Sequence, residues 1–202
     1  VPAPQRLSGN PYRTGRSMSW YCDYAQDNPI HGSYHDDEYG FPRQDEALLF
    51  ELLCLEIFQA GLSWELILKK RPTTYKAFDG FDVDTVAAYG DKDIERLLGD
   101  AGIIRNKLKV NSIIENAKRI QALRESHGGF ARFIEAHHPM AKSGWVKLFK
   151  KTFKFTGGEI VNEFLMCIGY LPGSHPADCA AYKRIAKQNP PWMQVDARVF
   201  EK

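Results

Sequence analysis

Apolar residues recur along much of this chain at the spacing of an α-helix. The clearest stretch is 106–126, where apolar side chains fall every three or four positions and mark one helical face. No segment shows a convincing alternation of apolar and polar residues, the pattern of a half-buried strand. Similar spacing, ended by glycine, proline or aspartate, predicts helices over residues 45–59, 63–70, 73–78, 84–89, 92–98, 130–136, 143–153, 158–168 and 176–187. The sequence therefore predicts an all-α fold.

Both ends of the chain lack this pattern. Residues 1–19 hold three prolines, two glycines and no apolar period, which indicates a disordered tail or residues foreign to the native protein, with Met18 as a plausible native start. Pro190 and Pro191 end the last helix, and residues 193–202 are expected to form a poorly ordered tail. We therefore predict one helical domain over residues 20–192.

Composition is that of an ordinary soluble protein. Of the 202 residues, 44% are hydrophobic and 26% are charged, and the net charge of +2 means that nucleic-acid binding would depend on local clusters of basic residues. The longest apolar stretch, 47–58, is interrupted by Glu51 and Glu56 and is too short to span a bilayer. Four cysteines without a secretory signal are typical of a reducing compartment. We expect a cytoplasmic protein with no membrane role.

Glu56 lies in the most apolar predicted helix, 45–59, which is apolar on nearly every side and is expected to be buried all round. An ionised carboxylate buried without a partner is costly enough that it usually protonates or acquires one. The partner could be an arginine or a neighbouring helix end, or it could be a ligand with a cationic or donor-rich face. The parts of a pocket for a nucleic-acid base follow closely: Gln59, Gly61, Leu62 and Trp64.

Five blocks, in order along residues 20–180, resemble the 3-methyladenine DNA glycosylase I family of the helix-hairpin-helix superfamily. They are YHDDEYG at 34–40, LEIFQAGLSW at 55–64 with ILKKR at 67–71, DAGIIRN at 100–106, FLM at 164–166 and HPADC at 175–179. The resemblance implies a monofunctional enzyme that flips 3-methyladenine-type purines out of double-stranded alkylated DNA and hydrolyses the N-glycosidic bond, leaving an abasic site. We expect it to act as a monomer.

The resemblance also implies roles for single residues. Glu56 and Tyr34 are the polar contacts to the flipped base, Trp64 stacks on it, and Gly61 with Leu62 enters the duplex where the base left. Gln59 is a further candidate contact to the base.

Three positions depart from the family pattern. The family usually has tryptophan where Tyr24 and Tyr39 stand, and tyrosine where His31 stands. Tyrosine is smaller than tryptophan and adds a hydroxyl, and His31 could donate a hydrogen bond or carry a proton near neutral pH. We place all three in the base pocket, although neutral drift of its wall would explain them equally. They also motivate an alternative function, a zinc-stabilised lesion- or DNA-binding protein of this fold without catalysis.

A zinc site is predicted from both ends of the domain. His175 and Cys179 are four apart, so on a helix both would face one side, and Cys22 with His35 completes a tetrahedral set. The resemblance implies the same four ligands, which would join the N- and C-terminal segments. Alternatively, the histidine lies at the surface and the cysteines are ordinary thiols. Four protein ligands leave no position for a reactive water, so the zinc is expected to be structural and a hydrolytic zinc enzyme is disfavoured.

DNA contacts are expected around the turn at 100–106. Gly102 would let backbone N–H groups face a phosphate, with Arg105, Lys107 and Lys109 adding charge, unless the turn is only a corner between helices. Two further clusters are basic: Lys69, Lys70 and Arg71 beside Trp64, and the five lysines of 142–154, which could instead be a solvated face. In that second cluster, the aromatic residues at 145, 149 and 153 are expected to lie in the core.

The expected chemistry needs little acid catalysis, because an N3- or N7-alkylated purine nucleoside carries positive charge that weakens its glycosidic bond. Helix-hairpin-helix glycosylases often carry a catalytic aspartate beyond the hairpin, and residues 101–126 contain none. Strand cleavage is not expected either, since no lysine stands out as a Schiff-base nucleophile.

Overall fold

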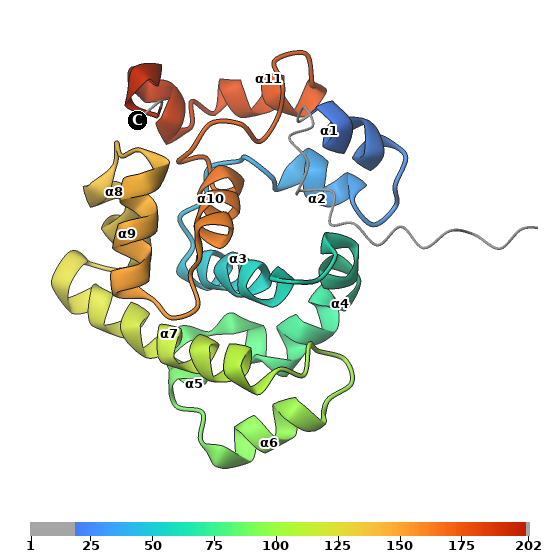
Figure 1. Ribbon diagram of the computed structural model, residues 1–202, viewed down its shortest axis with the longest axis vertical. Coiled ribbons are helices and arrows are strands. Elements are labelled where there is room, and N and C mark those ends of the chain that lie inside the picture. Colours follow the sequence, from blue (N-terminus) through green and yellow to red (C-terminus); the bar gives the residue numbers. More distant parts are fainter. Residues whose placement is uncertain (1–18, 201–202) are drawn as a thin grey trace, which may run out of the picture.

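The structure, a computed structural model, describes residues 19–200 and is helical throughout (Figure 1). The all-α prediction is confirmed: the described residues form eleven α-helices and no strand. Their bounds are α1 Ser19–Gln26, α2 Gly32–Asp37, α3 Glu46–Gln59, α4 Trp64–Ala77, α5 Val83–Ala87, α6 Asp91–Gly99, α7 Lys107–His127, α8 Phe130–His137, α9 Lys142–Thr152, α10 Gly158–Cys167 and α11 Ala180–Lys187. None of these helices is both long enough and apolar enough to cross a membrane.

Helix α3 is the centre of the packing. Figure 1 shows it between α10 on one side and α7 on the other, and it also contacts α4, α5 and α8. Its residues from 49 to 58 are all buried, which agrees with a helix that is apolar all round. Asp45 caps its start by accepting a hydrogen bond from the Leu48 N–H at 2.9 Å. The central, buried helix predicted from the sequence is therefore confirmed.

Helix α4 corrects one prediction. The sequence predicted separate helices over 63–70 and 73–78, but one helix runs from Trp64 to Ala77 with Pro72 inside it. A proline removes one backbone donor from a helix, yet the buried face of α4 continues beyond it to Thr74 and Ala77 and packs on α3. Tertiary packing thus outweighs the local cost of the proline.

The two chain ends of the domain differ from the predictions as well. Helices α1 and α2 were not predicted, because neither carries an apolar period long enough to detect. The last helix was predicted from 176, but it starts at Ala180, with Cys179 as its extended N-cap residue (φ −64°, ψ 138°). Proline suits the first turn of a helix, so Pro176 gave a misleading start signal.

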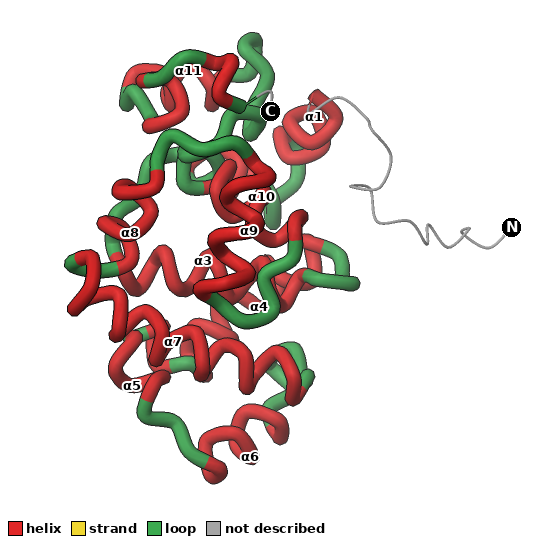
Figure 2. Tube along the Cα trace, turned by 60° about the vertical axis from the view of Figure 1, so that its left-hand side comes forward, coloured by secondary structure: helices red, strands yellow, loops and turns green. Residues whose placement is uncertain are grey.

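Residues 193–200, expected to be a poorly ordered tail, contain part of the 3-10 helix Pro191–Gln194 and the 3-10 helix Ala197–Val199. Phe200 packs against the core and stacks on His138. The end lies near α11 and away from α6 (Figures 1 and 2). The tail predicted over 1–19, with Met18, falls outside the described residues except for Ser19, which begins α1.

A buried ion network joins the helices around the centre. Arg71 of α4 donates to both carboxylate oxygens of Glu51 in α3, at 2.7 and 3.1 Å, and its third nitrogen lies 2.7 Å from Glu38, which follows α2. Arg71 belongs to the basic cluster that the sequence placed beside Trp64, but its guanidinium is held by two acids of the fold, Glu38 and Glu51. The network fixes α4 against α3.

Replacing Arg71 by alanine is expected to destabilise the protein by about 3–5 kcal/mol, because it leaves the carboxylate of Glu51, 6% exposed, without a partner. Urea unfolding measures the loss. The matched control is Lys69→Ala, which removes an exposed ion pair on the same helix and is expected to cost less than about 1 kcal/mol. Equal losses in the two variants would contradict this role for the network.

Candidate active site and metal centre

Four of the predicted site residues meet around the second half of α3. Tyr34 comes from α2, Tyr39 from the segment that follows it, Glu56 from α3, and Trp64 from the first turn of α4. All four are buried, with at most 6% of their surface exposed. The Tyr34 ring centroid lies 5.1 Å from that of Trp64 and 5.7 Å from that of Tyr39. The fold thus gathers an acid and three aromatic rings from separate segments of the chain.

The Glu56 carboxyl makes no ion pair with any residue from 19 to 200. Burial, and after it the negative charge of Glu163, raises its pKa well above the usual range. The sequence left open an arginine partner, but Arg71 binds Glu51 instead. Glu56 is therefore a buried acid whose ionised form still requires a positive or donor-rich partner.

The hydroxyl of Tyr34 donates to the sulfur of Cys167 at 3.4 Å. Burial raises the pKa of Tyr34 well above its ordinary value, so the phenol is neutral and can act as a donor. Cys54 and Cys167 are both buried. Cys167 therefore also supports one wall of the site.

Glu163 of α10 was missed by the sequence analysis. It is partly buried, and its Oε2 accepts a hydrogen bond from the Tyr39 hydroxyl at 3.0 Å. Burial is the main reason that its pKa is raised. An acid within the apolar stretch 160–168 is the same signal that singled out Glu56, and it was available from the sequence.

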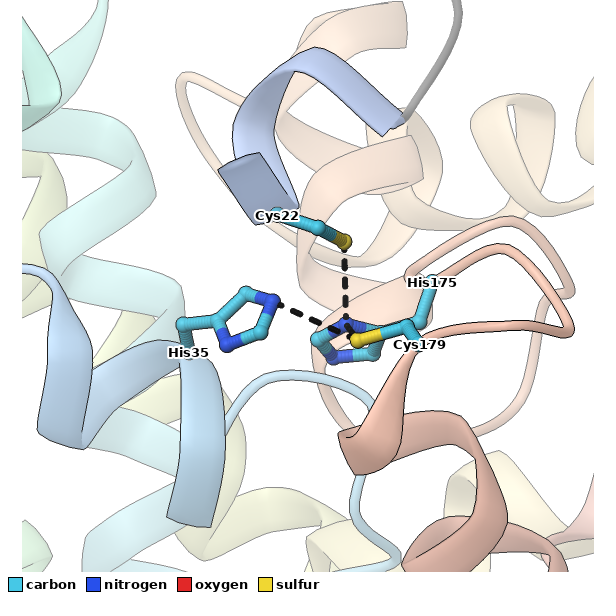
Figure 3. A group of neighbouring side chains, drawn as sticks. All are labelled: Cys22, His35, His175 and Cys179. Atoms are coloured by element: carbon cyan, nitrogen blue, oxygen red, sulfur yellow. Dashed lines mark hydrogen bonds between the residues drawn. The ribbon is translucent and has the colours of Figure 1, made fainter. Parts of the chain in front are cut away.

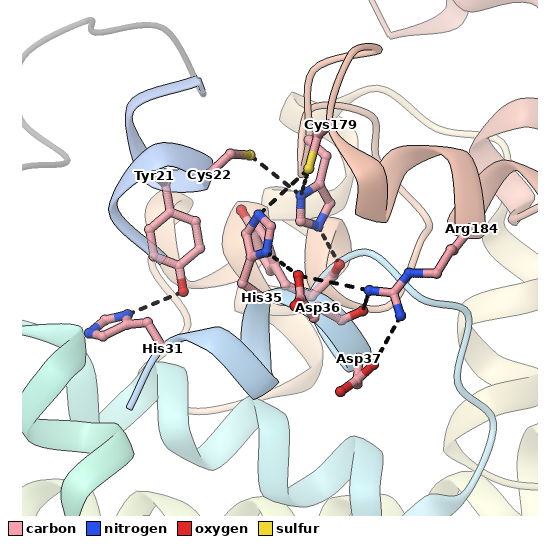
Figure 4. Close-up of polar contacts among 10 residues, drawn as sticks. Tyr21, Cys22, His31, His35, Asp36, Asp37, Cys179 and Arg184 are labelled. Carbon is pink, nitrogen blue, oxygen red and sulfur yellow. Dashed lines mark hydrogen bonds and ion pairs between the residues drawn. The ribbon is translucent and has the colours of Figure 1, made fainter. Parts of the chain in front are cut away.

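His31 and Tyr24 lie together at one side of the site, with ring centroids 5.1 Å apart. His31 is buried, and its Nδ1 lies 3.3 Å from the Tyr21 hydroxyl (Figure 4). Its Nε2 is buried with no hydrogen-bond partner among residues 19–200. Burial lowers the pKa of His31, which favours the neutral ring. Tyr24 is 39% exposed and donates to Glu65.

The loop between α3 and α4 begins at Gln59, whose carbonyl accepts the Leu62 N–H at 2.7 Å. Gly61 has a positive φ of 85°, and a Cβ added to it would meet no atom within 4 Å. Gly61 therefore lies at an open turn, and Leu62 beside it is only partly buried. Both predicted loop residues stand where another molecule can reach them.

Lys109 was expected to bind phosphate, and this prediction was wrong. Its side chain is buried, and its ammonium donates to the carbonyls of Phe58 and Ala60 at 2.8 and 2.7 Å. Carbonyls at the end of a helix lack intrahelical partners, and a lysine satisfies them here. Lys109 thus fixes the end of α3 from which the Gly61 loop starts.

The predicted hairpin at 100–106 joins α6 to α7 and is held against α4. Lys70 donates to the Ala101 carbonyl at 2.6 Å, and Thr73 donates to the Gly102 carbonyl at 2.7 Å. The Gly102 N–H, expected to face a phosphate, donates to the Asp100 carboxylate at 2.7 Å instead. Lys70 belongs to the basic cluster that the sequence placed beside Trp64, but its ammonium is used in this contact within the fold.

The remaining predicted basic contacts are at the surface. Arg105 and Lys107 are exposed, and Lys69 is exposed in an ion pair with Glu65. The lysines of the second cluster are exposed as well, whereas its aromatic rings are in the core, as predicted: Trp145, Phe149 and Phe153.

The four predicted metal ligands converge (Figure 3). Cys22 of α1, His35 of α2, His175 and Cys179 offer ligand atoms that all lie within 4.8 Å of one another. The sulfur-to-nitrogen distances are 3.6 Å for Cys22 to His175, 3.6 Å for Cys179 to His175 and 3.7 Å for Cys179 to His35. A tetrahedral zinc ion with ordinary bond lengths separates its sulfur and nitrogen ligands by about 3.6 Å. His175 and Cys179 reach this point from a turn and not from a helix face.

The second nitrogens of both histidines are also engaged. His175 Nε2 lies 2.7 Å from the Tyr39 carbonyl, and His35 Nδ1 lies 2.8 Å from the Asp36 carboxylate, which also faces Arg184 (Figure 4). These contacts leave His175 Nδ1 and His35 Nε2 free to bind a cation, as outer contacts do in metal sites. Burial lowers the pKa of His175 to about 4 and raises the pKa of Cys22 to about 12. The donor set therefore fits a cation that displaces thiol protons.

The sequence is similar to known proteins over most of its length. A model of the methyladenine glycosylase family matches residues 24–145. DNA-3-methyladenine glycosylase 1 of Escherichia coli is 36% identical over 180 residues, which cover 80% of this chain and 96% of the relative. DNA-3-methyladenine glycosylase of Haemophilus influenzae is 33% identical over 181 residues, covering 80% of this chain and 97% of the relative.

Solved structures agree with the sequence comparison. A variant of 3-methyladenine DNA glycosylase I in complex with 3-methyladenine has a TM-score of 0.73 and 28% identity, covering 80% of this chain and 97% of that one. The similarity thus extends from sequence to fold.

Replacing Glu56 by glutamine is expected to stabilise the free protein at pH 7. Because the folded pKa of Glu56 is raised, the folded protein loses stability as pH rises above the unfolded pKa of about 4.3, by about 1.4 kcal/mol for each unit of elevation. The gain in the variant should disappear below pH 4, where the acid is protonated in both states. Denaturant unfolding at several pH values measures it, and a variant less stable than the parent at pH 7 would oppose this account.

Proposed function

The chain belongs to the methyladenine glycosylase family, and from this premise we propose how its own site performs the reaction of a monofunctional DNA-3-methyladenine glycosylase in base excision repair. The substrate is double-stranded alkylated DNA, the bond hydrolysed is the N-glycosidic bond of a 3-methyladenine-type purine, and the product is an abasic site. The observation that carries the proposal is the buried carboxyl of Glu56, which has no ion partner among residues 19–200 and whose charge acts on the buried Tyr34.

Recognition begins when the alkylated nucleotide leaves the base stack. Flipping costs a few kcal/mol, and stacking of the base on Trp64 offsets part of this cost. Leu62, beside the open turn at Gly61, enters the space that the base vacates. The exposure of this turn and its attachment through Lys109 support that role.

Within the pocket, charge selects the base. An N3-alkylated purine nucleoside is positively charged, so it supplies the partner that ionised Glu56 requires, while the neutral Tyr34 hydroxyl donates a hydrogen bond. Gln59, Tyr39, His31 and Tyr24 line the remaining sides. Tyr34 must turn its hydroxyl from Cys167 to reach the base.

Bond breaking follows from the charge of the substrate. The cationic purine is already a good leaving group, so the site needs to orient the nucleotide and stabilise positive charge on the sugar. Glu56 and the DNA phosphates supply negative charge for this, and water completes the hydrolysis. The described residues of the hairpin and of α7 hold no aspartate in the position of an activating base, which accords with a charged and labile substrate.

Contacts to the DNA backbone position the enzyme without reading sequence. We assign this role to the hairpin around Gly102 and to Arg105, Lys107 and Lys69. The exposure of the three basic side chains supports it. A monomer suffices for this function, since all the residues assigned above lie on one chain. The four cysteines form no disulfide, which suits the reducing cytoplasm.

The metal cluster is proposed to hold a structural zinc ion. Cys22 and His35 come from the first two described helices, and His175 with Cys179 precedes the last, so a bound ion would tie both ends of the domain together. Four protein ligands leave no position for a reactive water. The zinc therefore supplies folding energy and no chemistry.

Glu56→Gln is expected to lower the single-turnover rate of 3-methyladenine release by about 10²- to 10³-fold, because the amide cannot offer a negative charge. Chromatography of bases released from methylated duplex DNA measures the rate. Glu95→Gln, an exposed acid on α6, is the control and should stay within about twofold of the parent. Full activity in the Glu56 variant would refute the assigned role, and binding without any base release by the parent would favour the non-catalytic alternative.

Removing the metal with a chelator, or through Cys179→Ser, is expected to lower the melting temperature by at least about 10 °C, since several kcal/mol of folding energy are lost at about 2–4 °C each. Protein that stays folded should retain most of its turnover. His127→Ala, a histidine outside the cluster, is the control and should keep its metal in elemental analysis. Turnover that disappears while the melting temperature stays constant would instead indicate a catalytic metal.

A further inference from the structure

Glu163 places a second acid beside the one that the proposed mechanism uses. It lies on α10, which packs directly on α3, and its negative charge contributes to the raised pKa of Glu56. Like Glu56, it forms no ion pair with any residue from 19 to 200; Lys142 of α9, whose charge acts on it, pairs with Glu159. The site therefore contains two acids and, among the described residues, no resident cation.

The side chain of Glu163 is tied to the aromatic wall of the pocket. Its Oε2 accepts a hydrogen bond from the Tyr39 hydroxyl at 3.0 Å. The Tyr39 ring stacks on the ring of Tyr34, and the Tyr34 ring contacts that of Trp64. Its Oε1 has only a long contact, 3.4 Å, from the Asn162 amide. Tyr39 stands where the family usually has tryptophan, so the group that donates to Glu163 in this chain is a phenol hydroxyl.

We propose that Glu163, oriented by the Tyr39 hydroxyl, is a second specificity-determining carboxylate of the base pocket and makes the pocket select positively charged purines over neutral ones. The proposal rests on the function proposed above and adds a residue and a selection rule to it.

Electrostatics supports the selection rule. Two nearby acids in a poorly hydrated site cannot both ionise without repulsion, so an empty pocket holds a proton in place of one negative charge. When a cationic purine binds, the proton leaves, and both carboxylates then attract the purine. A neutral base of the same shape gains nothing from the second acid. Glu163 should therefore affect the binding of charged and uncharged bases unequally.

The groups that face the two acids determine the pH dependence. Glu163 is surrounded by Glu56 of α3, Tyr39, Glu159 on its own helix and Lys142 of α9, while Glu56 also faces Tyr34 and Cys167. Removing the charge of Glu163 takes away the one other carboxylate that raises the pKa of Glu56. Cation binding should then persist to lower pH, because ionised Glu56 survives to lower pH.

The test uses two probes on the full chain: the 3,9-dimethyladeninium cation and neutral 3-methyladenine at pH 8. Dissociation constants come from quenching of tryptophan fluorescence. Glu163→Gln is expected to weaken binding of the cation about tenfold, which corresponds to one pKa unit of interaction, with binding of the neutral base nearly unchanged. The pH below which the protein loses cation binding should also fall. Glu95→Gln, an exposed acid on α6 that takes no part in these contacts, is the control and should change the binding of neither probe.

Tyr39→Phe separates direct action from positioning. It keeps the charge of Glu163 and removes its hydroxyl partner, so the preference for the cation should largely remain. The proposal is overturned if Glu163→Gln weakens the binding of both probes equally, or if the pH at which cation binding is lost does not change. It is also overturned if Tyr39→Phe abolishes the preference for the cation as fully as Glu163→Gln does. Failure of the proposed function is a separate result: the parent protein would then release no 3-methyladenine from methylated duplex DNA.

Discussion

The burial of the Glu56 carboxyl, which has no ion partner among residues 19–200, is the constraint on which this site depends. Helix α3 is apolar on all sides and is surrounded by other helices, so a glutamate within it is removed from water. This burial raises the pKa of Glu56 well above its ordinary range, which favours the protonated form in the free protein. In the function that we propose, a positively charged purine removes this penalty when it binds. The free enzyme would then be less stable than it could be, and the complex would gain selectivity.

Polar groups inside the fold hold the elements that surround this acid. Arg71 fixes α4, and therefore Trp64, against α3, and Lys109 satisfies the carbonyls at the end of α3 beside the Gly61 turn. The cluster of Cys22, His35, His175 and Cys179, which could hold a metal ion, brings α1 and α2, which carry Tyr24 and Tyr34, together with the segment before α11. His175 also contacts the Tyr39 carbonyl, so the cluster and the pocket share one segment of backbone. Together these contacts fix the segments that carry the site residues, and none of them pairs a described cation with Glu56.

Much of this arrangement could be predicted from the sequence, and the failures have a common cause. Periodicity located the long helices and the unusual position of Glu56, because both depend on local pattern. Arg71 and Lys109 were assigned to DNA because a basic residue near a loop has the same local pattern whether it faces solvent or a buried carbonyl. Pro72 inside α4 and the late start of α11 depend on tertiary packing, which overrides local signals. Glu163 was overlooked although its pattern matched that of Glu56, because no second acid was sought.

The most direct measurement is an NMR titration of the Glu56 carboxyl carbon in selectively labelled protein, with and without the 3,9-dimethyladeninium cation. If the buried acid is held for a charged purine, the free protein should titrate well above the ordinary range for glutamate, and the cation should convert the carboxyl to its ionised form at neutral pH. An ordinary titration curve that the cation does not alter would contradict this account.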